Sequence, residues 1–211
     1  MAAGPVTVNQ RIILATGNLG KLRELQRMLG AVFDLVPQTA LNLSAAEETG
    51  HTFTENALLK ARYASAQAGL PAIADDSGLE VDALGGAPGI RSARYAGIGA
   101  TDDENNEKLL EALGARPAGE RTARFRCVIV YVRTPDDPEP LIAEGVWEGR
   151  ILAAPRGTGG FGYDPLFLDE TVGLTGGELD PDEKNRRSHR GMAVRQLADL
   201  LGTGGLDQNL D

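Results

Sequence analysis

Two adjacent aspartates that follow a short apolar run place the strongest constraint on how this chain can fold. Ala72-Ile73-Ala74 is too short for a helix and begins after Pro71, which indicates a buried strand. Asp75-Asp76-Ser77-Gly78 would then stand at the C-terminal edge of that strand, where ligands bind in open α/β sheets. Neighbouring carboxylates repel each other unless a cation lies between them or one is protonated. An ordinary turn is the alternative, because Asp, Ser and Gly all favour turns.

The length of 211 residues suits one domain of one or two lobes, which we expect to span residues 1–202. The polar residues 203–211 are expected to form a mobile C-terminal tail. No apolar run approaches the ~20 residues of a membrane span, and the first eight residues lack a signal-peptide pattern. The single cysteine, Cys127, lies in an apolar run and is expected to be a buried thiol, which fits a cytoplasmic protein.

The charge of the chain limits the partners it can bind. A net charge of −9 would repel a long polyanion, so a nucleic acid polymer is not expected as a partner. A small anion held together with a metal ion remains compatible with this charge. The four lysines stand at positions 21, 60, 108 and 184, and three of them fall in the candidate motifs below. Lysine is a compact point charge that suits phosphate.

The first candidate motif is a glycine-containing turn between a strand and a helix. Arg11 to Ala15 is predicted to be a buried strand, and a helix is expected to follow and to end before Gly30. The intervening Thr16-Gly17-Asn18-Leu19-Gly20-Lys21 places a lysine at a helix N-terminus, which favours an anion such as phosphate. It is not a Walker motif, and Asn18 could serve only as an N-cap.

A second group of candidates lies between residues 47 and 69. Glu47-Glu48 is an acidic pair in a segment without periodicity, and it could be a metal site or merely a solvated surface. Thr52 and Glu55 have the spacing of a capping box, and the helix that follows is expected to end at Gly69. This helix presents Asn56 and Lys60 on one face, so Lys60 could face the site or lie on the surface.

The middle of the chain indicates a mixed sheet. Leu79 to Ala83 alternates as a half-exposed strand does, and Thr101 to Glu104 is a second capping box whose helix ends at Gly114. Residues 121–133 and 141–147 are expected to pair as a long antiparallel hairpin.

The last candidates are a glycine-rich loop and a basic cluster. Four glycines accompany Phe161 and Tyr163 within residues 156–165, and the two aromatic rings could stack on a purine or cover the edge of the core. Residues 184–195 hold the densest group of cations in this acidic chain, which an anion would stabilise. Carboxylates beside phosphate-binding cations indicate Mg²⁺, so the chain is expected to be a metal-dependent enzyme of a nucleoside polyphosphate.

Six segments in this order make the chain resemble the inosine/xanthosine triphosphate pyrophosphatase family from about residue 11 to 201. They are Thr16-Gly17-Asn18-Leu19-Gly20-Lys21, Phe53-Thr54-Glu55-Asn56-Ala57 with Lys60-Ala61, Ala74-Asp75-Asp76-Ser77-Gly78-Leu79, Gly85-Gly86-Ala87-Pro88-Gly89, Gly159-Gly160-Phe161-Gly162-Tyr163-Asp164-Pro165 and Ser188-His189-Arg190-Gly191.

The resemblance implies an α/β fold with two lobes around a long central mixed sheet flanked by helices, with the active site in the cleft between the lobes. It also implies a homodimer. The implied reaction is the Mg²⁺-dependent hydrolysis of ITP, dITP and XTP to the monophosphate and pyrophosphate, which would clear deaminated purines from the nucleotide pool.

Residue roles are carried over by position from the same resemblance. Asp76 is implied as the catalytic base, and Glu47 with Asp76 as the Mg²⁺ ligands, while Glu48 and Asp75 are supporting or alternative ligands. The implied triphosphate contacts are Thr16, Gly17, Asn18, Leu19, Gly20, Lys21, Lys60, Ser77 and Lys184. The implied base pocket consists of Phe161, Gly162, Tyr163, Asp164, His189 and Arg190.

Physical chemistry adds two expectations to these roles. A carboxylate on Mg²⁺ has a lowered pKa, so Asp76 is expected to orient a water and to accept its proton late. His189 and Arg190 are the candidates to donate to a 6-oxo purine, a pattern that rejects adenine and does not by itself exclude guanine. A pyrophosphatase of modified pyrimidine or methylated nucleotides and a non-catalytic nucleotide sensor are the competing hypotheses.

Overall fold

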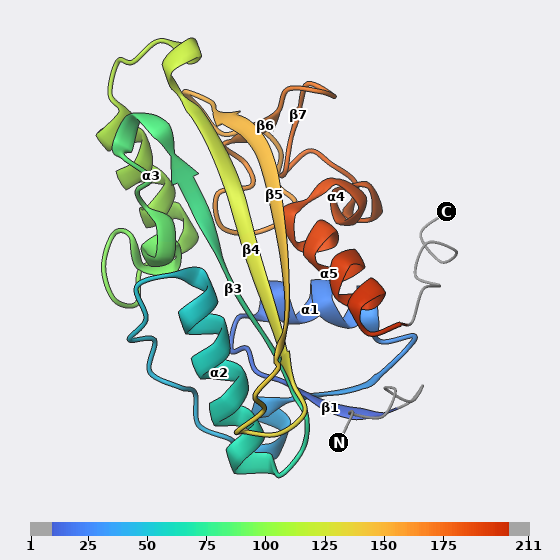
Figure 1. The fold of residues 1–211 in the computed structure, drawn as a ribbon. Coiled ribbons are helices and arrows are strands. Elements are labelled where there is room, and N and C mark those ends of the chain that lie inside the picture. The colour runs from blue at the N-terminus through green and yellow to red at the C-terminus, as the bar shows by residue number, and fades with distance from the viewer. Residues whose placement is uncertain (1–9, 203–211) are drawn as a thin grey trace. The chain divides into compact units, whose positions relative to one another are not determined.

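The computed structural model describes residues 10–202, so the predicted tail at residues 203–211 lies outside the described part of the chain. In chain order, the helices and strands are β1 (Arg11–Leu14), α1 (Leu19–Leu29), β2 (Asp34–Pro37), α2 (Phe53–Ala68), β3 (Ala72–Val81), α3 (Asp102–Leu113), β4 (Thr122–Val132), β5 (Leu141–Ile151), β6 (Phe167–Asp169), β7 (Leu174–Thr175), α4 (Pro181–Arg187) and α5 (His189–Leu200) (Figure 1).

Within residues 10–202, the strands form one seven-stranded sheet in the order β2-β1-β3-β4-β5-β6-β7. β1 pairs in parallel with β2 and with β3, whereas β5 pairs with β6, and β6 with β7, in antiparallel fashion. β4 and β5 are neighbours joined by residues 133–140, a connection too short for a parallel crossover, so they form the predicted hairpin. The sheet is therefore mixed and flanked by helices, as predicted.

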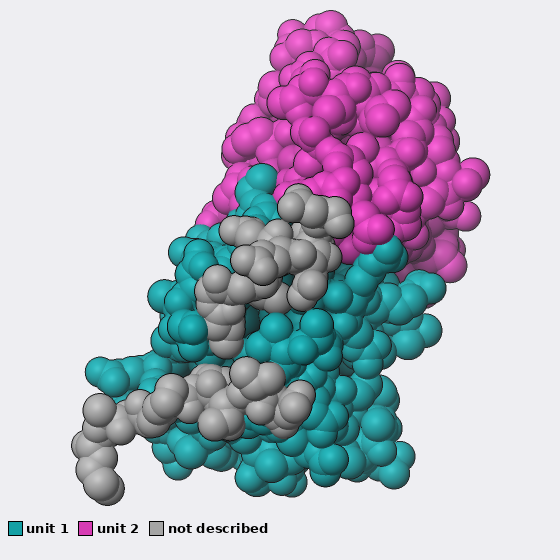
Figure 2. Space-filling model, turned by 90° about the vertical axis from the view of Figure 1, so that its right-hand side faces the viewer, with its two compact units in different colours: residues 1–76, 127–145, 190–211 teal, residues 77–126, 146–189 magenta. Residues whose placement is uncertain are grey.

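The chain divides into two compact units (Figure 2). Unit 1 comprises residues 1–76, 127–145 and 190–211, and unit 2 comprises residues 77–126 and 146–189. The single two-lobed domain and the active site in a cleft between the lobes stay predictions, and each unit is described below by itself.

The core of unit 1 lies between the sheet and the pair α1 and α5. Leu25, Met28 and Leu29 of α1 are buried against it, at the helical spacing that the sequence indicates. α2 covers the opposite face of the sheet with its alanine side, through Ala57, Ala61 and others, so the helix can approach the strands closely (Figure 1). The two faces of the sheet in this unit therefore carry different helices.

The core of unit 2 is rich in aromatic rings. Phe125 of β4 packs on Phe167 with ring centroids 4.6 Å apart, and Trp147 packs on Phe167 at 4.8 Å. The buried Tyr163 also belongs to this core. Of the two aromatic rings in the glycine-rich loop, Tyr163 thus covers the core, whereas Phe161 is half-buried.

The helix termini follow the sequence with two exceptions. α3 begins with the full capping box of Thr101 and Glu104, and α2 ends at Gly69 in the left-handed conformation, both as predicted. At the start of α2, however, the Glu55 carboxylate accepts from the backbone N–H of His51 and not of Thr52, so only half of the predicted box forms. Gly30 ends α1 as predicted, but its backbone is right-handed (φ −66°) and not in the left-handed conformation common for a glycine at this position.

β3 is the largest departure from the sequence prediction. The strand was expected to end after Ala74, with a separate strand from Leu79 to Ala83, but it runs unbroken for ten residues from Ala72 to Val81. Asp75, Asp76, Ser77 and Gly78 therefore lie inside the strand and not in a turn at its edge.

No helix within residues 10–202 is long and apolar enough to cross a membrane.

Candidate active site

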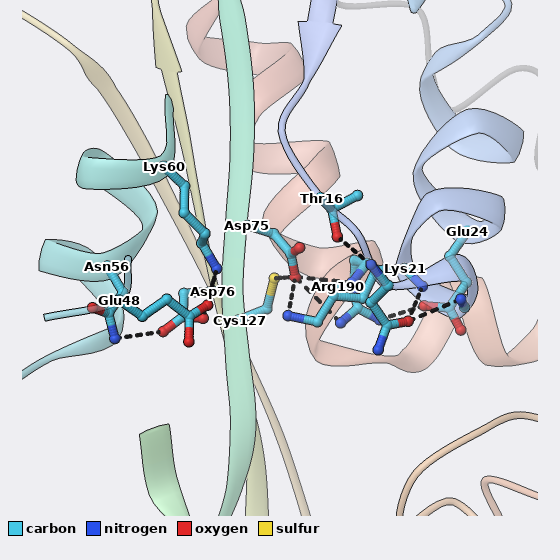
Figure 3. A network of polar contacts seen from close by, with 12 residues as sticks. Thr16, Lys21, Glu24, Glu48, Asn56, Lys60, Asp75, Asp76, Cys127 and Arg190 are labelled. Atoms are coloured by element: carbon cyan, nitrogen blue, oxygen red, sulfur yellow. Dashed lines mark hydrogen bonds and ion pairs between the residues drawn. The ribbon is translucent and has the colours of Figure 1, made fainter. Parts of the chain in front are cut away.

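β3 separates the two aspartates that the sequence places side by side. Successive side chains of a strand point to opposite faces of the sheet. Asp75 accordingly faces α1 and α5, and Asp76 faces α2 (Figure 3). One cation lying between the two carboxylates, which was one of the alternatives raised by their repulsion, is therefore not the arrangement in the structure. Each carboxylate instead meets a cation of its own, so the strand can continue without a solvated turn.

On the α2 side, Lys60 joins two carboxylates. Its Nζ lies 2.8 Å from Oδ1 of Asp76 and 3.0 Å from Oε1 of Glu48 (Figure 3). Asn56, one helical turn before Lys60, donates from Nδ2 to Oδ2 of Asp76 at 3.3 Å. Of the alternatives for Lys60, the one in which it faces the candidate site is therefore confirmed.

Asn56 also holds the acidic segment in place. Its Oδ1 accepts from the backbone N–H of Gly50 at 2.8 Å, two residues after Glu48. A Cβ on Gly50 would lie 2.7 Å from that same Oδ1, so only glycine permits this approach. The amide of Asn56 thus links the segment of Glu48 to Asp76.

Of the two adjacent glutamates, Glu48 is the one that contacts the group around Asp76. Glu48 is half-buried and contacts Lys60, whereas Glu47 is exposed to solvent. The predicted metal ligand Glu47 is therefore not the residue that the structure places with Asp76. The sequence could not separate the two glutamates, because the segment has no periodicity from which to infer a face.

Burial and charge set the protonation of this group. Burial raises the pKa of Asp76, although Lys60 and Lys21 oppose the shift. Burial alone would lower the pKa of Lys60, but the carboxylates of Asp76, Asp75 and Glu48 together raise it. Lys60 thus stays cationic, and Asp76 is a stronger proton acceptor than an exposed aspartate.

On the opposite face of β3, Asp75 is buried among cations. Lys21 Nζ lies 3.1 Å from its Oδ2, and Nε and Nη2 of Arg190 donate to the same oxygen at 3.4 Å (Figure 3). Arg190 also pairs with Glu24 of α1. Burial would raise the pKa of Asp75, but Lys21, Arg190 and Lys60 hold it well below the usual range. Burial raises the pKa of the neighbouring Cys127 thiol to about 12, so it stays protonated, as expected for a core cysteine.

This arrangement bears on two predicted contacts. Arg190 was predicted to bind the base. The residue is only 1% exposed, and its guanidinium pairs with Asp75 and Glu24. Glu24 was not predicted from the sequence as a site residue. Its position three residues after Lys21 on one helix could have indicated it. His189 is also buried, and its ring stacks on Phe125 with centroids 4.7 Å apart.

The turn at residues 16–21 has both of the features weighed from the sequence. Lys21 extends to Asp75, but Asn18 caps α1 by accepting from the backbone N–H groups of Gly20 and Lys21 at 2.9 and 3.0 Å. The Thr16 hydroxyl accepts from the N–H of Asn18 at 3.2 Å. An anion that binds these backbone donors would have to displace the Asn18 side chain. Leu19 points outward, 70% exposed.

The remaining predicted residues belong to unit 2. The buried Lys184 donates to Oδ2 of Asp164 at 2.6 Å and lies 4.9 Å from the ring centroid of Phe161. The same Asp164 oxygen accepts from the N–H of Phe161 at 2.8 Å. Lys184 was predicted to contact the triphosphate, and in the structure this α4 residue contacts the loop that carries Phe161. Ser77 is half-buried in β3.

These features define an α/β protein whose central strand presents an acidic and cationic group on each face. A sequence profile of the Ham1 family matches residues 12–200. The chain belongs to this family.

Relatives of known name cover nearly all of the chain. A protein of Methylococcus capsulatus named dITP/XTP pyrophosphatase is 57% identical over 201 residues, which cover 94% of this chain and 100% of the relative. One of the same name from Escherichia coli K12 is 55% identical over 196 residues, 92% of this chain and 100% of the relative.

Solved structures agree with the fold. A HAM1 protein from Coxiella burnetii has a TM-score of 0.85 at 51% identity, covering 92% of this chain and 99% of that one. A nucleoside-triphosphatase and dITP/XTP pyrophosphatase from Mycobacterium abscessus has a TM-score of 0.70 at 43% identity, covering 90% and 98%.

Replacing Asp75 by Asn tests the energetic role of the buried charges. The change leaves the cations of Lys21 and Arg190 without their shared carboxylate and should lower the free energy of unfolding by ~3–5 kcal/mol. Asp34→Asn is the matched control, because its pair with Arg11 is exposed on both sides, and should cost under ~1 kcal/mol. Urea unfolding measures both, and equal losses in the two variants would contradict the prediction.

The loss of unfolding free energy caused by Asp75→Asn is also expected to depend on pH in a defined way. Because the pKa of Asp75 is depressed in the folded state, its stabilisation is fully present above the unfolded value of ~3.9. It is lost only as the pH falls through the lower folded-state pKa. The difference between wild type and Asp75→Asn should therefore stay constant from about pH 8 to about pH 5.

Proposed function

We propose that this chain hydrolyses dITP, XTP and ITP to the nucleoside monophosphate and pyrophosphate, with Mg²⁺ as cofactor, and that it thereby removes deaminated purines from the nucleotide pool. As a member of the Ham1 family with relatives of that name at 55–58% identity, the chain is a nucleoside-triphosphate pyrophosphatase. The observation that carries the site assignment is the buried Asp76 carboxylate, held beside Lys60 and Glu48. We also expect a homodimer in the cytoplasm, as the resemblance implies.

Glu48 and Asp76 fit a magnesium ion. The ammonium of Lys60 already lies between these two carboxylates, so their oxygens converge on one cation. In the described part of the chain, no cluster of three or more His, Cys, Asp or Glu could hold a metal. Two carboxylates suffice for Mg²⁺, which takes its other ligands from phosphate and water. When bound, it supplies Lewis acidity toward phosphoryl oxygen and water.

Asp76 is suited to act as the proton acceptor. Burial raises the pKa of Asp76, whereas a bound Mg²⁺ would lower it, so Asp76 would orient a water and accept its proton late, and Asn56 fixes its second oxygen. A water oriented by Asp76 attacks the α-phosphorus and forms a new P–O bond as the bond to the bridging oxygen breaks. The proton of the water passes to Asp76, and the bond electrons leave with pyrophosphate. Lys21 and Lys60 stabilise the growing negative charge of the leaving group.

The Phe161 loop offers the groups that a purine needs. Phe161 is half-buried and carries a cation on one side of its ring, while Asp164 is held beside it. An aromatic face stacks on a base, and buried polar groups give selectivity because a mismatched base leaves them unpaired. Base binding by this loop is the part of the proposal that concerns specificity.

Replacing Asp76 by Asn tests the catalytic assignment. Pyrophosphate release from a panel of dITP, XTP, ITP, ATP, GTP and modified pyrimidine nucleotides, with and without Mg²⁺, should show the three proposed substrates in the wild type. Asp76→Asn should retain nucleotide binding and lower kcat by ~10²–10⁴, since positioned proton transfer contributes that much. Asp82→Asn, which changes an exposed aspartate just beyond β3, is the control and should leave kcat unchanged. A loss below about tenfold would refute the role of Asp76.

The neighbouring glutamates form a second matched pair. Glu48→Gln should raise the Mg²⁺ concentration for half-maximal activity at least about tenfold, because it removes one of two protein ligands. Glu47→Gln should leave that concentration unchanged, since Glu47 is exposed. Binding of Mn²⁺ in the presence of a non-hydrolysable nucleotide, followed by electron paramagnetic resonance, checks the result without turnover. The opposite order of the two variants would assign the metal to Glu47.

A further inference from the structure

The glycine-rich loop that carries Phe161, residues 157–164, is called the aromatic loop below. Its glycines allow many backbone conformations, and yet it has a defined shape. Its glycines include Gly157, Gly160 and Gly162, with φ angles of 78°, 74° and 60°. Glycine loses more conformational freedom on ordering than any other residue. Contacts from outside the loop must therefore hold the shape in which Phe161 is presented.

One residue of the aromatic loop, Gly162, is held at both of its backbone polar groups by α3. The backbone N–H of Gly162 donates to Oδ2 of Asp102 at 2.7 Å. Nδ2 of Asn106 donates to the carbonyl oxygen of the same Gly162 at 2.9 Å. Asp102 and Asn106 are four residues apart and so share one face of the helix. A residue next to Phe161 is thus fixed by two side chains from a distant part of the sequence.

α3 is itself well anchored. Its capping box fixes the first turn, in which Asp102 stands, through hydrogen bonds between Thr101 and Glu104. The buried Asn105 accepts from the N–H of Ala96 at 2.8 Å and so ties the helix to the segment before it. Asp102 and Asn106 therefore act from a rigid base.

The contacts inside the aromatic loop do not replace those of α3. Asp164 accepts from the N–H of Phe161, the residue before Gly162, and from the ammonium of Lys184. Tyr163 donates from its hydroxyl to the carbonyl of Ser92 at 2.8 Å. Within residues 10–202, the backbone N–H and carbonyl of Gly162, whose φ is positive, are hydrogen-bonded only by the two α3 side chains.

We propose that Asp102 and Asn106 are positioning residues that preorganise the aromatic loop for the purine, so that nucleotide affinity depends on them. This inference rests on the proposed function, because it takes the loop as the base site. Neither residue belongs to the group around Asp76. Their loss should therefore weaken binding of the base and leave the chemical step intact. Preorganisation raises affinity by removing the ordering cost from the binding step.

Three variants of the first turn of α3 test the proposal. Asp102→Ala removes the acceptor for Gly162, Asp102→Asn keeps an oxygen that can accept, and Asp103→Ala removes the adjacent exposed charge without touching the loop. KM and kcat are measured with dITP and with ribose 5′-triphosphate, which has no base. Hydrogen exchange of residues 157–164, followed by mass spectrometry, reports on the loop without any substrate.

Asp102→Ala should raise KM for dITP roughly tenfold, the effect of losing one charge-assisted hydrogen bond from the binding shape, with kcat within about twofold. Its kcat/KM for ribose 5′-triphosphate should match the wild type, and its loop should exchange faster. Asp102→Asn should restore most of the affinity, and Asp103→Ala should behave as wild type. Asn106→Ala and Asn106→Asp should both resemble Asp102→Ala, since neither can donate to Gly162.

Equal kinetics and equal exchange in Asp102→Ala and Asp103→Ala would overturn the proposal. A parallel loss on dITP and on ribose 5′-triphosphate would also overturn it, because the effect would then not act through the base. The proposed function fails separately, if the wild type releases no pyrophosphate from dITP. In that case the hydrogen exchange of the loop decides whether α3 holds it.

Discussion

The separation of Asp75 and Asp76 by the pleat of β3 is the constraint on which the rest of the site depends. Adjacent carboxylates in one strand can be buried only if each finds its own counter-ion on its own face. α2 supplies Lys60 on one side, and α1 and α5 supply Lys21 and Arg190 on the other. The helices on both faces therefore neutralise the strand as well as cover it.

The two faces nevertheless influence each other. Asp75 helps to raise the pKa of Lys60, and Lys21 opposes the rise in the pKa of Asp76, because charges interact across the thin strand. The roles of the two aspartates differ all the same. Asp76 is 6% exposed and lies beside the half-buried Glu48, whereas Asp75 is 1% exposed and pairs with Lys21 and Arg190. The proposed chemistry belongs to Asp76, and Asp75 pairs with Lys21 and Arg190.

Unit 2 solves a different problem, which is to hold a glycine-rich loop in one shape. Its Tyr163 lies in the aromatic core, Asp164 bridges Phe161 and Lys184, and Asp102 with Asn106 fixes Gly162. Flexible backbone thus presents Phe161 through side chains of more rigid elements. A loop that must approach a ligand closely needs glycine, and the fixed contacts compensate for the freedom that glycine brings.

Local sequence patterns were enough to predict most of the helices and strands and the class of enzyme. The apolar runs predicted most of the strands, and the capping box of Thr101 and the glycine after α2 predicted helix ends. The spacing of Asn56 and Lys60 predicted that they share one face of α2, and in the structure both contact Asp76. The ordered motifs predicted the family. Three features became known from the three-dimensional contacts: β3 continues through its aspartates, Glu48 and not Glu47 lies beside Asp76, and Arg190 binds Asp75 and Glu24. Local patterns give propensity and spacing, but the face on which a side chain finds its counter-ion depends on residues distant in the chain.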